Sequence, residues 1–207
     1  MKKALVVQGG WEGHQPKEVA ELFESILKAE NFDVEVSDTL DSLIDGEKLL
    51  GLNLIVIVWT MGTITKEQLD PLLAAVQSGV GIAGCHGGLG DSFRNDTEFQ
   101  YMVGGQWVAH PGNDGVNYTV NIKQKDNALV AGIEDFPVCS EQYYMHTDPG
   151  NQVLATTNFG EVVMPVVWTK TYGEGKVYYN SLGHQANIVA MPEVTELMRR
   201  GFVWSAK

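Results

Sequence analysis

The sequence predicts an α/β fold with a parallel sheet and helices on both faces, and three patterns lead to this prediction. Short, continuously apolar runs such as Leu54–Trp59 are typical of strands that are buried on both faces. Other runs, such as Thr65–Gln77, carry apolar side chains at helical spacing and predict amphipathic helices. The two kinds of run alternate over the first half of the chain, which is the order of strand–helix–strand units in a parallel sheet.

The first half is expected to hold strands at Lys3–Val7, Phe32–Val36, Leu54–Trp59 and Val80–Cys85. Pro16 stands where a first helical turn accepts proline. It precedes an apolar stripe at helical spacing that consists of Val19, Leu22, Phe23, Ile26 and Leu27. The helix over Thr65–Gln77 likewise carries Leu69, Leu72, Leu73 and Val76 on one face.

The sequence pattern changes after about residue 104. Strands are expected at Asn117–Ile122, Gln152–Thr156, Val162–Trp168 and Lys176–Asn180. They are separated by Gly, Asn and Pro, with no long helical pattern between them. A helix over Met191–Trp204 closes the chain. The sequence shows no repeat and no linker, so we expect a single domain over residues 1–207 with extra β-structure in its second half.

The composition limits the partners of the chain. A net charge of −12 lacks the basic footprint that nucleic acid or an anionic membrane requires. No apolar run approaches the ~20 residues of a bilayer span. The N-terminal run breaks into GGWEGH too early for a signal peptide, and two cysteines in separate segments argue against a disulfide framework. We therefore expect a cytoplasmic protein whose partner is a small molecule.

Most of the histidines follow predicted strands. His14 lies in the loop after the first strand, and His86 and His184 directly follow later ones. His146 lies in EQYYMHTDPG, after a further candidate strand. Because ligands of open parallel sheets bind beyond the carboxyl ends of the strands, we expect these four on one rim, and His110 is left without a position. A single histidine is more often structural, but this set with its glycine neighbours favours a site. No HExxH spacing is present, so the fold would have to assemble any metal site.

Charged and aromatic residues accompany the histidines along the sequence. They are Glu12, Asp91, Arg94, Glu141, Asp148, Trp11, Trp107 and Tyr143. Aromatic faces beside hydrogen-bonding groups suit a sugar, because a sugar ring has an apolar face and a rim of hydroxyls. Each carboxylate taken alone is about as often a solvated charge or a helix cap.

The stretch AGCHG at residues 83–87 resembles a nucleophile elbow, in which a tight strand-to-helix turn exposes a nucleophile. Cys85 would then attack the substrate, and His184 would act as its base. Alternatively, Cys85 is a small core residue at the end of a buried strand. The residues alone leave both interpretations open.

Several longer motifs resemble the ThuA-like family, which is named for trehalose utilisation. They are GVGIAGCHGGLGDSFRNDTEFQYMVGGQWVAHPG, EDFPVCSEQYYMH, VVMPVVWTKTYGEGKVYYNSLGH and MRRGFVW. The resemblance runs from the first strand to the last helix. It implies the fold of the class I glutamine amidotransferase-like superfamily, with a flavodoxin-like sheet, which agrees with the order of elements above.

The resemblance and the residue patterns above together give the candidate site residues. The family usually has Phe or Leu before the elbow histidine, so Cys85 departs from its pattern and is discounted as an obligatory nucleophile. The catalytic candidates are His86, His184, Glu141 and His146. The substrate-binding candidates are Trp11, His14, Gly87, Gly88, Asp91, Trp107, His110 and Tyr143, and the candidate metal ligands are His14, His110, His146 and His184.

The function that the resemblance implies is catabolism of disaccharides or related glycosides, often beside NAD-dependent oxidoreductases that produce keto-sugars. We expect an isomerase or hydrolase that acts on such a sugar by histidine-mediated proton transfer, with a divalent metal such as zinc as its candidate cofactor. Two alternatives stay open, a Cys–His hydrolase or amidotransferase-like enzyme and a non-catalytic sugar-binding module. QGGWEGH does not fit a phosphate loop, so no bound dinucleotide is expected. Homo-oligomerisation is left open.

Overall fold

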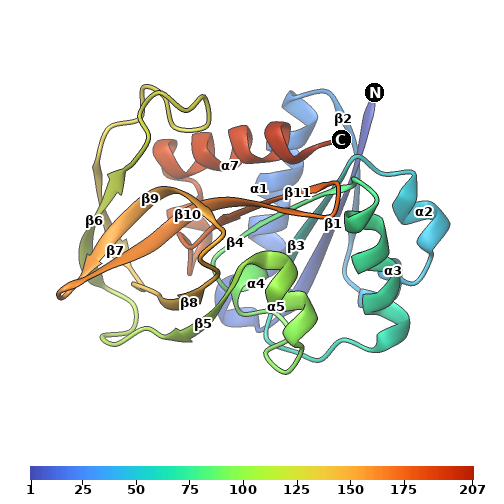
Figure 1. Cartoon of the computed structure of the whole chain (residues 1–207), viewed down its shortest axis with the longest axis horizontal. Coiled ribbons are helices and arrows are strands. Elements are labelled where there is room, and N and C mark those ends of the chain that lie inside the picture. Colours follow the sequence, from blue (N-terminus) through green and yellow to red (C-terminus); the bar gives the residue numbers. More distant parts are fainter.

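The fold is built on one mixed sheet with the strand order β2-β1-β3-β4-β11-β10-β9-β6-β7. A separate two-stranded ribbon pairs β5 with β8. The computed structural model describes residues 1–207. Figure 1 shows the sheet crossing the molecule, with α7 above it, α4 and α5 below it, and only strands at the far left, around β6 and β7. This is the α/β architecture that the sequence predicts.

Five strands at one end of the sheet run parallel to one another. They are β2 (Phe32–Ser37), β1 (Lys2–Gly10), β3 (Leu54–Thr60), β4 (Gly81–Cys85) and β11 (Gly175–Asn180). Every residue of β3 except Trp59 is buried, as expected for a strand covered on both faces. The carboxyl ends of parallel strands meet at one edge, so the residues that follow β1, β3, β4 and β11 gather there.

Alternate side chains of these strands enter two separate cores. Ala4 packs in one core with α1 (Pro16–Ala29) and α7 (Pro192–Ser205). The next residue, Leu5, packs in the other core with α3 (Lys66–Gln77). Successive side chains of a strand point to opposite faces of a sheet, so a continuously apolar strand serves both cores.

Shorter helical segments connect the strands. They are η1 (Glu12–His14), η2 (Leu40–Leu43), α2 (Gly46–Leu50), α4 (Gly87–Gly90), α5 (Thr97–Val103) and α6 (Ala186–Val189). The sequence pattern predicts no helices there, because segments of three to seven residues are too short to show a helical period. The two long helices of the first half are present. α1 starts at Pro16, and Thr65 caps α3 through a reciprocal bond with Gln68.

The second half of the chain continues the same sheet with antiparallel pairs. Its strands are β10 (Val162–Tyr172), β9 (Gln152–Phe159), β6 (Val116–Ile122) and β7 (Phe136–Ser140). Four antiparallel steps separate β7 from β11, so β7 runs in the direction of β11 again. The residue that follows β7 therefore leaves the sheet on the same side as the residues that follow the parallel strands.

The ribbon of β5 (Gly105–Ala109) and β8 (Tyr144–Thr147) was not assigned from the sequence, and neither was β7. The strands expected at 117–122, 152–156, 162–168 and 176–180 correspond to β6, β9, β10 and β11, each extended at one or both ends. These strands are hard to predict because β5 and β7 have five residues that include Gly or Pro, and β8 has only four residues, so each shows little alternation. The expected closing helix is present as α7.

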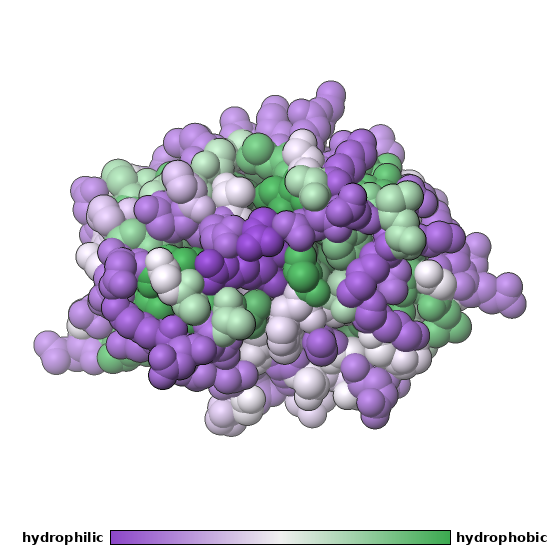
Figure 2. Space-filling model, turned by 90° about the horizontal axis from the view of Figure 1, so that it is seen from above, coloured by the Kyte–Doolittle hydropathy of each residue, from purple (hydrophilic) through white to green (hydrophobic).

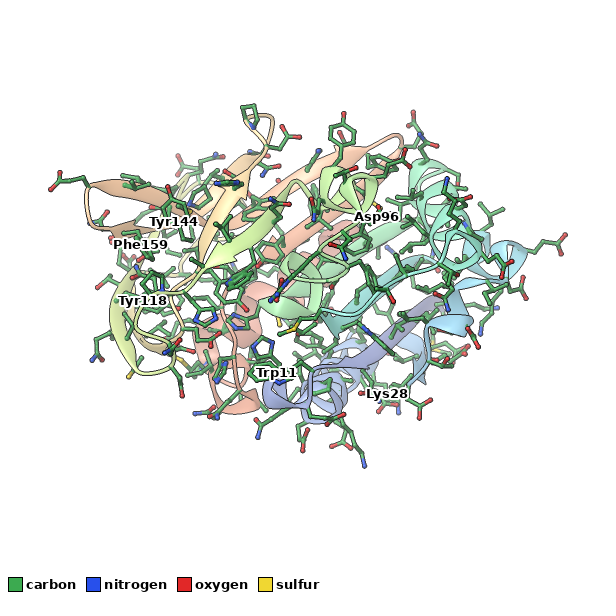
Figure 3. The ribbon with its side chains drawn as sticks, turned by 90° about the horizontal axis from the view of Figure 1, so that it is seen from below. Trp11, Lys28, Asp96, Tyr118, Tyr144 and Phe159 are labelled. Carbon is green, nitrogen blue, oxygen red and sulfur yellow. The ribbon has the colours of Figure 1, made fainter.

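Figure 2 shows the face at which both chain ends lie, and this face is largely hydrophilic with scattered apolar patches. No helix in the structure is both long enough and apolar enough to cross a membrane. The opposite face, seen in Figure 3, carries Trp11 in the loop after β1.

Candidate functional site

One carboxylate, that of Glu141, lies among four histidines. Its Oε2 is 3.1 Å from His86 Nε2, 3.3 Å from His184 Nδ1 and 3.8 Å from His14 Nε2. Its Oε1 is 3.7 Å from His110 Nδ1. Glu141, His14 and His86 are buried, whereas the side chains of His184 and His110 are 12% and 27% exposed. We call these five residues the Glu141 cluster.

Three of the histidines come from the carboxyl ends of neighbouring parallel strands. His14 ends η1, which follows β1, while His86 directly follows β4. His184 lies in the loop after β11, the strand that pairs with β4. A fourth strand end contributes Thr60, whose Oγ1 lies 2.8 Å from His14 Nδ1. The sheet topology thus brings together residues that are up to 170 positions apart in the sequence (184 − 14).

Glu141 arrives from the other end of the sheet, directly after β7. Two hydrogen bonds hold this junction. The hydroxyl of Ser140 donates to the carbonyl oxygen of Gly183 at 2.6 Å, next to His184, and the hydroxyl of Tyr118 donates to the carbonyl oxygen of Glu141 at 3.1 Å. The Ser140 bond joins the last strand of the sheet to the loop after β11, so the antiparallel half curls back onto the parallel half at the cluster.

The elbow after β4 presents His86 rather than Cys85. His86 has φ 50° and ψ −135°, a conformation that L-residues rarely adopt. Cys85 is the last residue of β4 and its side chain is buried in the core. Burial raises the pKa of the Cys85 thiol to about 12, so little thiolate forms at neutral pH. The geometry therefore disfavours Cys85 as a nucleophile.

Close packing around the elbow depends on glycines. A Cβ at Gly87 would lie 2.7 Å from the imidazole of His14, and a Cβ at Gly183 would lie 2.5 Å from Cβ of His86. A Cβ at Gly88 would lie 3.0 Å from Cα of Val58. Gly87 and Gly88, both predicted as substrate-binding residues, thus let the elbow approach His14 and the strand β3, respectively.

His86 has an acceptor at each of its ring nitrogens. Nδ1 lies 2.9 Å from the carbonyl oxygen of Ser181, and Nε2 lies 3.1 Å from the carboxylate of Glu141. A neutral imidazole carries one N–H, so one contact is a hydrogen bond and the other places a lone pair against an oxygen. Burial lowers the pKa of His86 to about 4, which keeps the ring neutral at pH 7. A cation shared with Glu141 would remove this conflict.

The charge of Glu141 is set by opposing influences. Burial by itself raises the pKa of this carboxyl group, but contacts with His14 and His86 and the nearby histidine charges lower it below its usual value. The group is therefore ionised at neutral pH. His184 Nδ1 and His110 Nδ1 are buried atoms without a hydrogen-bond partner, although both lie near this carboxylate.

Aromatic rings border the cluster on two flanks. Tyr143 stacks on His86 with ring centroids 3.9 Å apart, and Trp107 lies 5.3 Å from His110. Trp11 meets His14 edge-on at 4.8 Å and is 46% exposed. In Figure 3 the indole of Trp11 lies at the front of the face on which the parallel strands end. Trp11, Trp107 and Tyr143, predicted from the sequence as substrate-binding residues, thus adjoin the cluster.

Two predicted site residues lie elsewhere or are already paired. His146 was expected on the rim, after a strand, but it lies within β8 with its side chain exposed, and it does not join the cluster. The alternation of β8 buries Met145 in the core and turns His146 outwards. Asp91 is buried, but both of its carboxylate oxygens accept hydrogen bonds from Arg94, at 2.6 and 2.8 Å.

The sequence matches the family ThuA, described as trehalose utilisation, over residues 3–205. The chain belongs to the ThuA family. This confirms the resemblance found in the sequence motifs and links the chain to sugar metabolism. No curated protein matches the sequence.

Solved structures resemble this ThuA-family chain over its whole length. A ThuA-like protein from Parabacteroides merdae has a TM-score of 0.81 at 19% identity, over 100% of this chain and 90% of that one. A cytoplasmic protein from Salmonella typhimurium has a TM-score of 0.72 at 15% identity, over 99% and 97%. The β-galactosidase from Rahnella sp. R3 has a TM-score of 0.66 at 18% identity, over 99% of this chain but 30% of the enzyme. At such identities the likeness shows the fold alone.

Several polar residues that orient the ThuA-family cluster were not found from the sequence. They are Thr60, Tyr118, Ser140, Tyr179, Asn180 and Ser181. All except Tyr118 stand at the carboxyl end of a strand or directly after it. The position at a strand end that indicates the histidines also indicates the hydroxyl residues Thr60, Ser140 and Tyr179. Asn180 and Ser181 contact His86 through backbone carbonyls, which a pattern of side chains does not reveal.

Proposed function

We propose that this protein is a metal-dependent enzyme of sugar catabolism, in which His14, His86, His184 and Glu141 hold one divalent cation. One atom from each of these residues lies within 4.8 Å of the corresponding atoms of the others. A nitrogen-rich set of three imidazoles and one carboxylate suits zinc and related transition metals. The observation that carries the proposal is that His86 faces an oxygen at each ring nitrogen, Ser181 at Nδ1 and Glu141 at Nε2, although a neutral ring has only one N–H.

The outer contacts of two histidines support the same proposal. Ligating histidines usually donate the remaining ring N–H to a carbonyl or another oxygen, which fixes the ring and exposes the other lone pair. The Nδ1 atoms of His14 and His86 meet Thr60 and Ser181 in this way, and both Nε2 atoms point toward Glu141. A cavity of about 20 Å³ adjoins the histidines, which is room for one water molecule.

A keto-sugar, or a glycoside derived from one, is the proposed substrate. The cation would act as an electrophile and stabilise negative charge on the carbonyl oxygen. His110 is not needed as a ligand and is the most exposed residue of the cluster. It is therefore the residue left to accept a proton from the substrate carbon next to the carbonyl group. Trp11 is the exposed aromatic face against which a sugar ring would lie.

Metal content tests the proposal directly. Tag-free protein purified without chelator is expected to hold about one zinc, manganese or nickel per chain by elemental analysis. His86→Gln and Glu141→Gln are expected to lower zinc affinity by more than about 100-fold, since even the loss of outer contacts costs 10–100-fold. His146→Gln is the matched control, because His146 lies outside the cluster and should leave affinity unchanged.

Absence of metal in the purified protein, together with no measurable zinc binding on titration, would overturn the metal centre. A second experiment measures turnover of keto-sugars by the zinc-loaded protein. His86→Ala and His184→Ala should fold and lose this activity. Retained activity in both variants would contradict a catalytic role for the cluster. A sugar that raises the melting temperature but is recovered unchanged would instead indicate a binding module.

A further inference from the structure

Residues at the end of β11 and directly after it make three contacts with His86. The carbonyl oxygen of Asn180 accepts the backbone N–H of His86 at 2.7 Å, and that of Ser181 lies 2.9 Å from the imidazole Nδ1. In the third contact the hydroxyl of Tyr179 donates to the carbonyl oxygen of His86 at 2.9 Å. Tyr179 and Asn180 at the end of β11, with Ser181 directly after it, therefore fix the backbone and the ring of the one residue that follows the neighbouring strand β4.

This arrangement matters because the backbone of His86 is strained. A non-glycine residue at φ 50°, ψ −135° persists only where its surroundings over-determine it. Both peptide groups beside His86 must be held. The carbonyl of the second accepts the backbone N–H of Gly90 from within the elbow, and Tyr179 is the side chain that ties it to the neighbouring strand β11. Its ring is fully buried and lies 4.3 Å from that of Trp168, so the hydroxyl has a fixed position.

We infer that Tyr179 is a positioning residue that keeps His86 in the elbow conformation and thereby aims Nε2 at Glu141. This inference rests on the proposed function for its consequence, the strength of metal binding, but the orientation of His86 is measurable without a metal. Removal of the hydroxyl leaves the carbonyl oxygen of His86 with one donor instead of two, the backbone N–H of Gly90 at 3.0 Å, so the elbow is held less firmly and can relax. The imidazole would move with the backbone to which it is attached.

The neighbouring residue offers a matched control. Tyr178 is also fully buried and also donates its hydroxyl to a backbone carbonyl, that of Leu197 in α7, at 2.8 Å. It points to the opposite face of the sheet, into the core that contains α1 and α7. Tyr178→Phe and Tyr179→Phe therefore delete the same atom from equally buried rings, but only the second deletion touches the elbow.

The experiment compares the two variants by NMR of metal-free protein with ¹⁵N-labelled histidine. The signals of His86 are identified by their loss in His86→Gln. Tyr179→Phe is expected to shift the backbone amide and ring signals of His86, and Tyr178→Phe to leave them in place. Zinc affinity is measured in parallel by competition with a chromophoric chelator. Tyr179→Phe is expected to weaken it 10–100-fold, and Tyr178→Phe less than about twofold.

Unchanged His86 signals in Tyr179→Phe would overturn the inference, as would equal changes in both variants, which would indicate a general loss of stability. If the wild-type protein binds no zinc, the metal centre fails, but the NMR comparison still decides whether Tyr179 orients His86. Shifted signals with unchanged zinc affinity would overturn the link from Tyr179 to the metal.

Discussion

The two halves of the sheet contribute to the cluster in different ways. The parallel half supplies three histidines, each directly after a strand or in the loop that follows it, and the strands β1, β4 and β11 are fixed between two cores. The antiparallel half supplies one residue, Glu141, at the end of the five-residue edge strand β7. The histidines are therefore positioned by the core, whereas the carboxylate depends on a few hydrogen bonds.

This difference separates what is rigid from what is adjustable in the site. His86 and His184 both have positive φ, at 50° and 87°, and Gln15 beside His14 has φ 48°. Strain of this kind is tolerated where the surrounding structure is firm. On the other side, Ser140 and Tyr118 tie the Glu141 segment to its surroundings with one hydroxyl each. Substitutions in the two halves should therefore have effects of different size on stability and zinc affinity.

The largest expected effect is a loss of stability in acid that originates in the parallel half. Burial lowers the pKa of His86 from 6.5 to about 4, so the unfolded chain binds more protons than the folded one between these values. The stability is present above pH 6.5 and is lost as the pH falls toward 4. From pH 7.5 to pH 4 the loss from this residue is about 3 kcal/mol, at 1.36 kcal/mol per pKa unit.

Urea unfolding of metal-free protein at several pH values measures this loss. His86→Gln cannot titrate and should lack about 3 kcal/mol of the pH dependence, whatever its stability at pH 7.5. The lowered pKa of Glu141 acts in the same direction but below its ordinary value of 4.5, so it does not imitate the effect of His86 at higher pH. An identical pH dependence in wild type and His86→Gln would show that folding does not lower the pKa of His86.

A smaller effect is expected from the connection between the halves. Ser140→Ala removes the hydroxyl that donates to Gly183 and should cost about 1–3 kcal/mol of stability, because a buried carbonyl loses its donor. Glu141 should also become less well placed, and zinc affinity should fall about tenfold. The matched control is Ser205→Ala, whose equally buried hydroxyl donates to Gly201 at 2.8 Å within α7. It should lower stability and leave zinc affinity unchanged.

Equal zinc affinity in Ser140→Ala and Ser205→Ala would contradict the view that the antiparallel half depends on this tie. Glu141 would then be held by β7 and by the cluster itself.

The difference between the two halves also explains which strands could be predicted from the sequence. The parallel strands are predictable because continuous apolar runs such as Leu54–Trp59 are set between helical stripes. The short strands β5, β7 and β8 have weak patterns, and their places are decided by pairing with distant segments. The closing of the sheet at Ser140 and Gly183 is a tertiary contact that no local pattern encodes.

The cluster shows the same division. His14, His86 and His184 are predictable as neighbours because they follow parallel strands. The sequence placed His146 on the rim and left His110 without a position, because both lie in regions of weak pattern. In the structure His110 faces Glu141, and His146 points outwards from β8. The inward or outward direction of a residue in a four-residue strand depends on register, which a shift of one position inverts.

The smallest effect is expected at the two cysteines, which again differ between the halves. Cys85 ends a buried strand of the parallel half, and burial raises its pKa to about 12, whereas Cys139 in β7 is exposed. Iodoacetamide at neutral pH should therefore label Cys139 and leave Cys85 unreacted in the folded protein, as peptide mass spectrometry would show. Cys139→Ser should abolish the labelling. Rapid labelling of Cys85 with loss of activity would instead favour the Cys–His enzyme, because only an accessible thiolate at the elbow reacts in that way.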